Sequence, residues 1–338
     1  MKNSGHFPCG NYDKESMEAA RKNNGILNVD IELTRHCNIN CKYCYSASGK
    51  ALDDELTLDE IKRVISDAKG MGARTVTLNG GEPAIHPNFI EIVEFISSKD
   101  MLTQLFTNAI PITKKTAQIL VQNKVYPCVS IESLNPAVHD YLTEVPGSLE
   151  KTLQGIENLI EAGYTKEMPL TINAVMMKAN YDDLEDLWNW AEQKNIQPTI
   201  LRLIPTGRGH VDMGVSPEQV KSLVEKIAVG RNYDPSIPYL ADSGCRKHFM
   251  SCFVNAKGFV QLCSCIHATL GNIRFKSLPD IIRESSIFRD MRNIDNELIG
   301  KCATCKHKSR CYGCRAIAYA MTGNMFESDP MCWGCASS

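Results

Sequence analysis

Three closely spaced cysteines are the first residues of this sequence whose arrangement suggests chemistry. Cys37, Cys41 and Cys44 lie in the stretch CNINCKYC, with three residues in the first gap and two in the second. Three thiolates can bind three irons of a four-iron cubane cluster and leave the fourth iron without a protein ligand. Such an open iron can bind a substrate or a cofactor, whereas an electron-storing cluster has all four irons ligated. A zinc knuckle is the alternative, but it requires four ligands and a different spacing.

The other cysteines are concentrated near the end of the chain. Of 15 cysteines, only Cys9 and Cys128 lie apart from the groups, and ten fall between Cys245 and Cys335. An intracellular chain keeps its thiols reduced, so clustered cysteines indicate metal ligands rather than disulfides. A zinc ribbon built on two C-x2-C pairs is the alternative, but the loop of five residues between the pairs is short for one. Eight cysteines are enough for two closed sets of four: Cys245, Cys252, Cys263, Cys302, Cys305, Cys311, Cys314 and Cys332.

Short β-branched segments alternate with amphipathic helical segments from about residue 28 to residue 230. Capping boxes begin two of the helices, at Thr57 with Glu60 and at Ser216 with Gln219. Other helices are expected at residues 89–98, 113–122 and 148–163, and before Asn195. Six strand–helix repeats predict parallel strands joined by right-handed crossovers. The predicted strands are residues 29–34, 74–78, 101–106, 126–133, 169–177 and 198–205.

Polar residues share one face of several predicted strands. Examples are Asp30, Glu32 and Thr34 in the first strand, and Cys128, Ser130 and Glu132 in the fourth. A flat parallel sheet covered by helices on both sides is apolar on both faces, so this pattern favours a barrel with a polar interior. We therefore predict an α/β fold: an N-terminal extension over residues 1–27, a partial (β/α)6 TIM-like barrel over residues 28–235, and a small cysteine-rich domain over residues 236–338.

The three-cysteine motif, with Tyr43 before its last cysteine, resembles the signature of radical S-adenosylmethionine (SAM) enzymes. The resemblance implies that Cys37, Cys41 and Cys44 bind a [4Fe–4S] cluster whose open iron binds SAM. In that family, one electron from the cluster cleaves SAM to a 5′-deoxyadenosyl radical, which abstracts a hydrogen from the substrate. The family also implies a flavodoxin or a ferredoxin-type protein as the electron donor.

The stretch NGGEP, residues 79–83, strengthens the resemblance. In the family this turn meets the methionine end of SAM, where glycines allow close backbone approach and the glutamate accepts from the ammonium group. The resemblance thus implies these SAM-binding residues: Gly80, Gly81, Glu82 and Pro83, followed by Asn108, Ser130 and Glu132. Many relatives have aspartate at the position of Glu132. The last three residues lie at strand ends and are equally well explained as ordinary polar residues.

The cysteine-rich tail resembles the SPASM extension of radical SAM enzymes, which usually holds two auxiliary [4Fe–4S] clusters. Such clusters accept the electron that remains after hydrogen abstraction, or hold substrate. Two features depart from the family: the gap between Cys311 and Cys314 has two residues rather than three, and the surplus Cys265 and Cys335 could replace a ligand. Carried over by order, the first set is Cys245, Cys252, Cys263 and Cys314, and the second set is Cys302, Cys305, Cys311 and Cys332. The resemblance therefore implies three clusters in all.

Composition and charge exclude several classes of partner. The formal net charge is −2, so no basic field attracts nucleic acid or an anionic membrane. No apolar run approaches the length of a signal peptide core or a membrane span. We expect a cytoplasmic protein.

We expect an oxidoreductase or maturase that modifies a peptide or a protein. Oxidation of a tetrapyrrole side chain is the alternative: LIPTGRG, residues 203–209, resembles a segment of the haem-biosynthesis branch, and Arg202 and Arg208 could pair with propionates. Both arginines are equally well explained as ordinary turn residues. Only 27 residues precede the first strand, too few for a peptide-binding winged-helix module, which weakens a leader-peptide substrate. A further alternative is a non-enzymatic iron–sulfur electron carrier. Such a carrier needs neither an open iron nor the NGGEP turn, so both features argue against it.

Cys128 has two interpretations. On an inward strand face it could donate a hydrogen atom to a substrate radical, and it is then the one candidate catalytic residue outside the cofactor sites. A buried core cysteine is the simpler interpretation and the one we favour.

Overall fold

The computed structural model describes residues 12–165, 167–231, 249–308 and 311–335. Within these residues, nine strands form one curved sheet in the order β6-β5-β4-β3-β2-β1-β7-β8-β9. Strands β6 and β9 are its two edges, so the barrel is open, as the predicted partial barrel requires. The strands are β1 (Asn28–Glu32), β2 (Thr75–Asn79), β3 (Leu102–Thr107), β4 (Val125–Ser130), β5 (Thr171–Met176), β6 (Gln197–Arg202), β7 (Ser251–Val254), β8 (Phe259–Cys263) and β9 (Ile266–Asn272).

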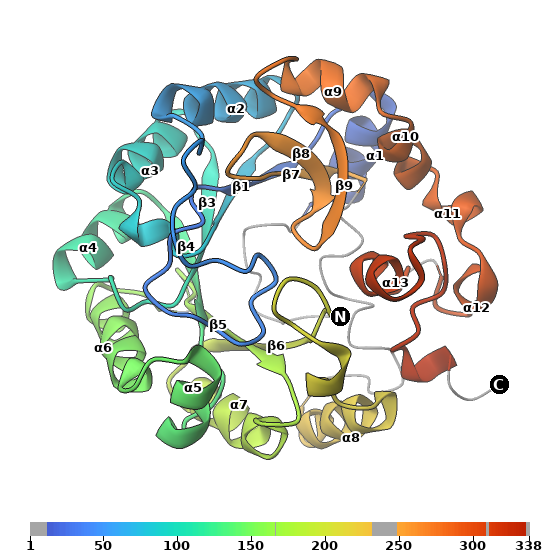
Figure 1. Ribbon diagram of the computed structural model, residues 1–338. Helices are drawn as coiled ribbons and strands as arrows, with labels where there is room; N and C mark the ends of the chain where they lie inside the picture. Colours follow the sequence, from blue (N-terminus) through green and yellow to red (C-terminus); the bar gives the residue numbers. More distant parts are fainter. Residues whose placement is uncertain (1–11, 166, 232–248, 309–310, 336–338) are drawn as a thin grey trace.

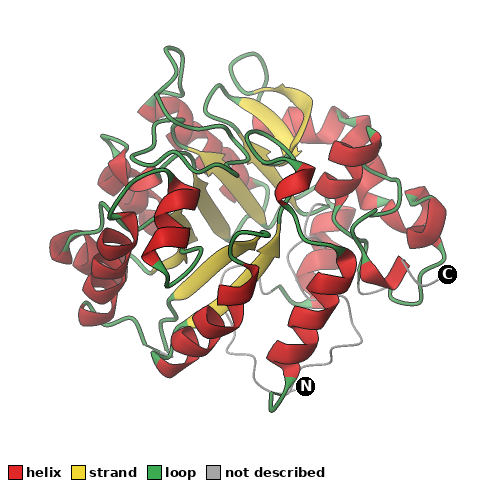
Figure 2. Ribbon diagram, turned by 60° about the horizontal axis from the view of Figure 1, so that its bottom comes forward, coloured by secondary structure: helices red, strands yellow, loops and turns green. Residues whose placement is uncertain are grey.

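Helices form a ring around the outside of this sheet (Figure 1), and the strands lie inside that layer (Figure 2). None of the helices in the described parts of the chain has both the length and the apolar character that crossing a membrane requires. The helices are α1 (Lys14–Lys22), α2 (Leu58–Gly70), α3 (Phe89–Ser98), α4 (Lys114–Gln122), α5 (Pro136–Thr143), α6 (Ser148–Glu161), α7 (Leu184–Gln193), α8 (Pro217–Ala228), α9 (Leu278–Glu284), α10 (Ser286–Arg292), α11 (Ile294–Glu297), α12 (Gly300–Ala303) and α13 (Arg315–Thr322).

The six predicted strand–helix repeats are confirmed. Strands β1 to β6 pair in parallel with their sequence neighbours. Both predicted capping boxes are present, at Thr57 with Glu60 and at Ser216 with Gln219. These caps satisfy backbone N–H groups that a helix start would otherwise leave without partners.

Helix α5 is a difference from the sequence prediction. The fourth strand was expected to reach residue 133, but β4 ends at Ser130. Just beyond it, Asn135 accepts a hydrogen bond from the Ala137 N–H and Pro136 occupies the first helical turn. This cap and proline start a helix of eight residues, which is too short to show a clear helical period.

The tail extends the barrel sheet. Strand β7 pairs in parallel with β1, so that Ser251 lies opposite Asn28, and β8 and β9 follow as antiparallel neighbours. One hydrophobic core runs through both parts, from Ile31 in the barrel to Phe288 and Ile317 beyond β9. The cysteine-rich region is therefore packed directly on the barrel, although the predicted boundary at residue 235 lies outside the described residues.

Candidate functional site

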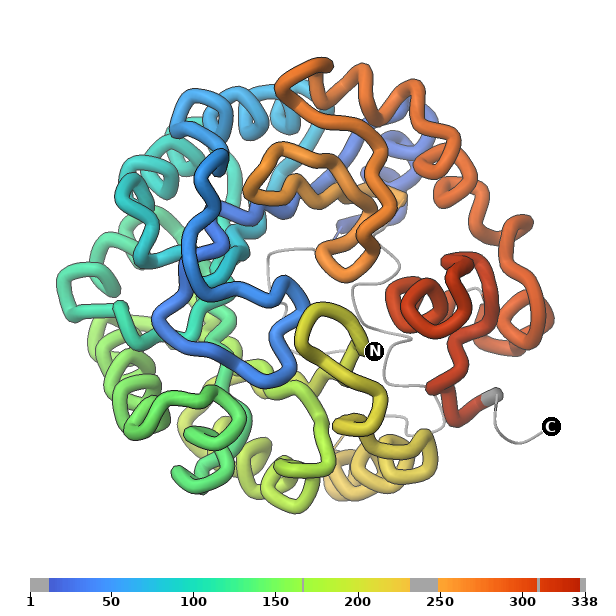
Figure 3. The backbone as a smooth tube through the Cα atoms, viewed as in Figure 1, coloured from blue at the N-terminus to red at the C-terminus, as the bar shows by residue number. Residues whose placement is uncertain are grey.

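The three-cysteine loop lies across the mouth of the barrel, directly after β1. The Cys37 N–H donates to the Gly49 carbonyl at 2.9 Å, which closes the loop on itself. Arg208, in the loop after β6, donates its backbone N–H to the Cys44 carbonyl at 2.9 Å and its Nε–H to the Cys41 carbonyl at 2.8 Å. Figure 3 shows these two loops side by side, in blue and yellow. The first and the sixth strands together therefore position the cysteines.

All three cysteines line one cavity of about 720 Å³ inside the barrel mouth. Burial raises the pKa of Cys37 to about 12, and it also raises the pKa of Cys41. Because the thiolate is the form that binds metal, these thiols lose their protons only beside a positive charge such as iron. Three sulfur donors on one loop fit a cluster with one open iron.

The NGGEP turn packs against the start of the three-cysteine loop. The Gly81 N–H donates to the Thr34 carbonyl at 2.7 Å, and the Glu82 N–H donates to the His36 carbonyl at 2.9 Å. A Cβ on Gly81 would lie 2.2 Å from the His36 carbonyl oxygen, and a Cβ on Gly80 would lie 2.7 Å from that of Thr34. Neither position accepts a side chain without backbone movement, and both glycines line the cavity.

Glu82 is fully buried, and its carboxylate has partners within the protein. It accepts hydrogen bonds from the Thr107 hydroxyl at 2.7 Å and from the backbone N–H groups of Asn108 at 2.7 Å and Ala84 at 3.0 Å. Burial raises the pKa of Glu82 to about 7, although these donors favour the charged form. Glu82 and the buried Pro83, which starts a short 3-10 helix, do not line the cavity, so their contact with SAM stays a prediction.

The other predicted SAM-binding residues, Asn108, Ser130 and Glu132, line the cavity. Glu132 accepts a hydrogen bond from the Tyr43 hydroxyl and another from the Val175 N–H at 2.7 Å. Burial raises the pKa of Glu132 to about 7. Because Tyr43 belongs to the three-cysteine loop, this carboxylate joins the loop to the ends of β4 and β5.

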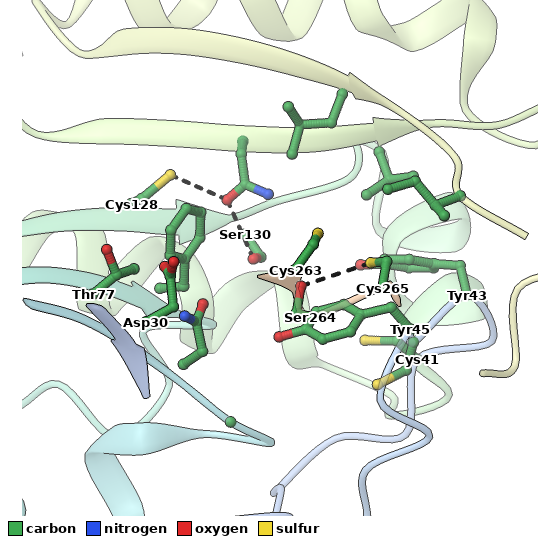
Figure 4. Close-up of a pocket in the computed structure, with 18 of the residues that line it drawn as sticks. Asp30, Cys41, Tyr43, Tyr45, Thr77, Cys128, Ser130, Cys263, Ser264 and Cys265 are labelled. Atoms are coloured by element: carbon green, nitrogen blue, oxygen red, sulfur yellow. Dashed lines mark hydrogen bonds between the residues drawn. The ribbon is translucent and has the colours of Figure 1, made fainter. Parts of the chain in front are cut away.

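Asn173, which the sequence analysis did not single out, organises the deeper wall of the cavity. Its Oδ1 accepts from the Cys128 thiol at 3.3 Å and from the Ser130 hydroxyl at 3.4 Å (Figure 4). Cys128 is 3% exposed and lines the cavity, and burial raises its pKa to about 12. Its role as a hydrogen donor stays a prediction. The alternation of β5 is the missed signal, since Thr171, Asn173 and Val175 share a face that lines the cavity.

The first predicted set of tail cysteines is only partly brought together. Cys263 and Cys314 line the same cavity as the three-cysteine loop, and so does the surplus Cys265. Cys252 is fully buried in the hydrophobic core and does not line the cavity. Cys245 lies outside the described residues.

Members of the second predicted set lie near one another. Burial, together with the neighbouring thiols of Cys332 and Cys302, raises the pKa of Cys311 to about 11. The Cys305 N–H lies 3.5 Å from the Cys302 carbonyl oxygen, within one tight turn. In the described parts of the chain, no three His, Cys, Asp or Glu side chains converge as ligands of a single metal ion.

Comparison with known proteins identifies the family. Residues 31–191 match the family model of the radical SAM superfamily, and residues 245–306 match SPASM, an iron-sulfur cluster-binding domain. The AdoMet-dependent heme synthase of Methanosarcina barkeri is 30% identical over 334 residues, covering 89% of this chain and 94% of that protein. The chain belongs to the radical SAM superfamily. It is therefore an enzyme rather than an electron carrier, with SAM and [4Fe–4S] clusters as its cofactors.

Further relatives of this radical SAM enzyme include the mycofactocin maturase MftC of Mycolicibacterium smegmatis, 28% identical over 90% of this chain and 82% of that protein. Among solved structures, Streptococcus suis SuiB bound to precursor peptide SuiA is similar, with a TM-score of 0.75 at 19% identity, covering 95% of this chain and 79% of that one. The structure of anSMEcpe with bound AdoMet and Cp18Cys peptide has a TM-score of 0.71 at 15% identity, covering 92% and 94%. At these identities the two structures support the fold.

The two arginines considered as propionate partners are occupied within this radical SAM enzyme. Arg202 forms an ion pair with Asp329 at 2.5 Å, and the two side chains are only 7% and 0% exposed. Arg208 donates to the Cys41 carbonyl and, at 2.7 Å, to the Ser48 carbonyl. Both arginines also line the cavity, so the hypothesis that they bind substrate carboxylates stays a prediction.

Proposed function

We propose that this enzyme carries out a radical-initiated oxidation of a substrate held in the cavity at the barrel mouth. One observation carries the proposal. The three cysteines of the first loop line the same cavity as three cysteines of the tail. A site for SAM cleavage and a site for accepting an electron would therefore face one substrate chamber.

The side chains around this chamber have distinct roles in the proposal. When bound, the cluster and SAM supply the one-electron chemistry that begins with hydrogen abstraction. Cys37, Cys41 and Cys44 hold the iron, and the bare backbone of Gly80 and Gly81 leaves room for SAM. The carboxylate of Glu132 and the hydroxyl of Ser130 are placed to accept hydrogen bonds from the cofactor, since both line the cavity.

The proposal includes two auxiliary clusters, and thus three clusters in all. The grouping of the tail cysteines supports this number. Cys263 and Cys314 line the cavity. Cys302, Cys311 and Cys332 lie near one another and form a second group. A flavodoxin or ferredoxin-type protein is the proposed electron donor. We propose a cytoplasmic location, because the clusters require cysteines that stay reduced.

The proposed substrate is a peptide or a protein. Support comes from the mycofactocin maturase among the relatives and from two similar structures, of SuiB and anSMEcpe, that hold bound peptides. A tetrapyrrole is the second candidate, because the 30% identical relative that this chain covers almost fully is a heme synthase. Arg202 and Arg208 line the cavity, but both already have partners within the protein, so they favour the tetrapyrrole only weakly.

The two substrate classes differ in their sensitivity to protease, and this difference provides a direct test. The enzyme is purified without oxygen, reconstituted with iron and sulfide, and supplied with SAM and dithionite. A fractionated extract of the source cells is added either intact or after digestion by a protease that has then been removed. The formation of 5′-deoxyadenosine is measured in both cases, and an iron-loaded tetrapyrrole bearing propionates is assayed in parallel.

Each outcome bears on the proposal. Stimulation that protease abolishes supports a peptide or protein substrate. Stimulation that survives protease, together with turnover of the tetrapyrrole, supports the second candidate. If the reconstituted enzyme forms no 5′-deoxyadenosine under any of these conditions, the proposed function is wrong.

A further inference from the structure

Cys252 is held away from the cavity by the pairing of its strand. Along β7, Ser251 and Phe253 line the cavity, and so Cys252 and Val254 point to the opposite face, where both are 0% exposed. This alternation is the period-two geometry of a strand. Cys252 lies opposite Val29 of β1, and both belong to the hydrophobic core.

A cluster on the cavity wall is therefore out of reach for Cys252 without a change of register. A slip of one residue would bring its thiol to the cavity but would turn Ser251 and Phe253 into the core. The register is fixed on both edges of β7, by β1 on one side and by β8 on the other. On this face Cys252 is packed within the hydrophobic core.

Cys265 has the opposite surroundings. It follows β8 in the tight turn that leads into β9, with only Ser264 between it and Cys263 (Figure 4). Both cysteines line the cavity, and the hydrogen bond and charge interaction between their thiols show that the two sulfurs are neighbours. Cys314 lines the same cavity and interacts electrostatically with Cys265. Three cysteines with mutual interactions thus line the chamber.

Tyr45 connects this group of sulfurs with the first loop. Its hydroxyl interacts electrostatically with Cys265 and Cys263 and also with Cys44, and all four residues line the cavity. A cluster bound at the β8–β9 turn would consequently face the same cavity as the three-cysteine loop, with Tyr45 interacting with the cysteines of both.

We propose that Cys265, together with Cys263 and Cys314, binds the auxiliary cluster that faces the cavity, and that Cys252 is a core residue. This assignment replaces Cys252 in the ligand set that order along the chain implies. It rests on the proposed function only in requiring that the auxiliary cluster exists, and it does not depend on the substrate.

Two matched variants test the assignment: Cys265→Ala and Cys252→Ala. Each is reconstituted anaerobically, and iron and sulfide are counted alongside Mössbauer spectra and EPR spectra of the reduced protein. With three cubane clusters, the unaltered protein binds about 12 irons. We expect Cys265→Ala to fall to about 8 irons or to show a three-iron cluster signal, and Cys252→Ala to keep the full content and spectra.

A third variant separates ligation from folding. Cys265→Ser keeps a small polar side chain, so a ligand role predicts a shifted EPR signal of the auxiliary cluster in a protein with an unchanged circular dichroism spectrum. A structural role predicts an unchanged signal. Full iron content and unaltered spectra in both Cys265 variants would overturn the assignment, and so would loss of about four irons from a folded Cys252→Ala protein.

Two different measurements on the same reconstituted proteins distinguish this test from the test of the proposed function. Formation of 5′-deoxyadenosine reports on the first loop, and iron content reports on the tail. The variants could show the expected changes in iron content while the unaltered protein forms no 5′-deoxyadenosine. That result would contradict the proposed function and leave the Cys265 assignment intact.

Discussion

At Gly81 the backbone of the NGGEP turn approaches the three-cysteine loop so closely that no side chain fits. An added Cβ would lie 2.2 Å from the His36 carbonyl oxygen, and the neighbouring hydrogen bonds from Gly81 to Thr34 and from Glu82 to His36 fix this contact. We expect Gly81→Ala to lower the free energy of unfolding by about 3 kcal/mol, because the backbone must move. Urea unfolding of the apoprotein measures this change.

Gly49 provides a matched control for that substitution. It lies at the other end of the same loop, where an added Cβ meets nothing within 4 Å. We expect Gly49→Ala to change the free energy of unfolding by less than about 1 kcal/mol. An equal loss of stability in both variants would show that the loop is sensitive to any added side chain, and not to the close approach at Gly81.

The buried carboxyl group of Glu132 makes the stability of the apoprotein depend on pH. Burial raises its pKa from 4.5 to about 7, so between these values the folded state holds a proton that the unfolded state has released. The stabilisation is complete below pH 4.5 and is lost as the pH rises through 7. A shift of this size corresponds to a contribution on the order of 3 kcal/mol.

Glu132→Gln removes this proton uptake while keeping an oxygen that can accept from the Val175 N–H. We expect the stability of the variant relative to the unaltered apoprotein to rise by up to about 3 kcal/mol between pH 5 and pH 7.5. Urea unfolding at several pH values measures this difference, and the exposed Glu150→Gln serves as the control. Parallel curves for Glu132→Gln and the unaltered protein would contradict the prediction.

At the scale of the elements, a buried ion pair joins the end of β6 to the last described segment of the chain. Asp329 accepts from the Arg202 guanidinium and also from the Cys314 N–H at 2.8 Å, so one carboxylate connects the barrel to a predicted cluster ligand. Asp329→Ala leaves a buried guanidinium without its partner. We expect it to lower the free energy of unfolding by about 3 to 5 kcal/mol.

An exposed ion pair provides the comparison for that variant. The Lys114–Glu161 pair joins α4 and α6 with both side chains more than half exposed, and Glu161→Ala is expected to cost less than about 1 kcal/mol. Urea unfolding measures both variants, and iron analysis shows whether the loss of Asp329 also displaces Cys314. Similar small losses in the two variants would mean that the buried pair contributes little.

The sequence predicts the elements whose signals are local and misses the contacts that span the chain. Capping boxes and alternating strands identify six strand–helix repeats. The pairing of β7 with β1 joins residues more than 200 positions apart, and no local pattern indicates it. The Tyr43–Glu132 hydrogen bond and the Arg202–Asp329 pair join residues 89 and 127 positions apart, and the second gives Arg202 a structural partner that no local pattern indicates.

At the scale of the whole molecule, the barrel and the tail share one sheet, one core and one cavity. Cysteines separated by some 220 residues thus face the same chamber, from Cys44 on the first loop to Cys265 at the β8–β9 turn. In the proposed function, SAM is cleaved beside the first loop and the electron is accepted beside the tail cysteines of the same chamber. The second predicted cluster, with Cys302 and Cys311 among its proposed ligands, would involve cysteines that do not line this cavity.

This separation of steps predicts different effects from cysteine variants in the two parts. Cys41→Ala removes a ligand of the SAM-binding cluster, and we expect it to abolish 5′-deoxyadenosine formation. Cys305→Ala alters only the distant cluster, so we expect 5′-deoxyadenosine to form while the finished product falls to the level of an enzyme-free control. Both compounds are quantified by mass spectrometry, with substrate from the fraction identified by the protease test. Full product formation by Cys305→Ala would exclude the distant cluster from the electron route and leave the cluster beside Tyr45 as the sole acceptor.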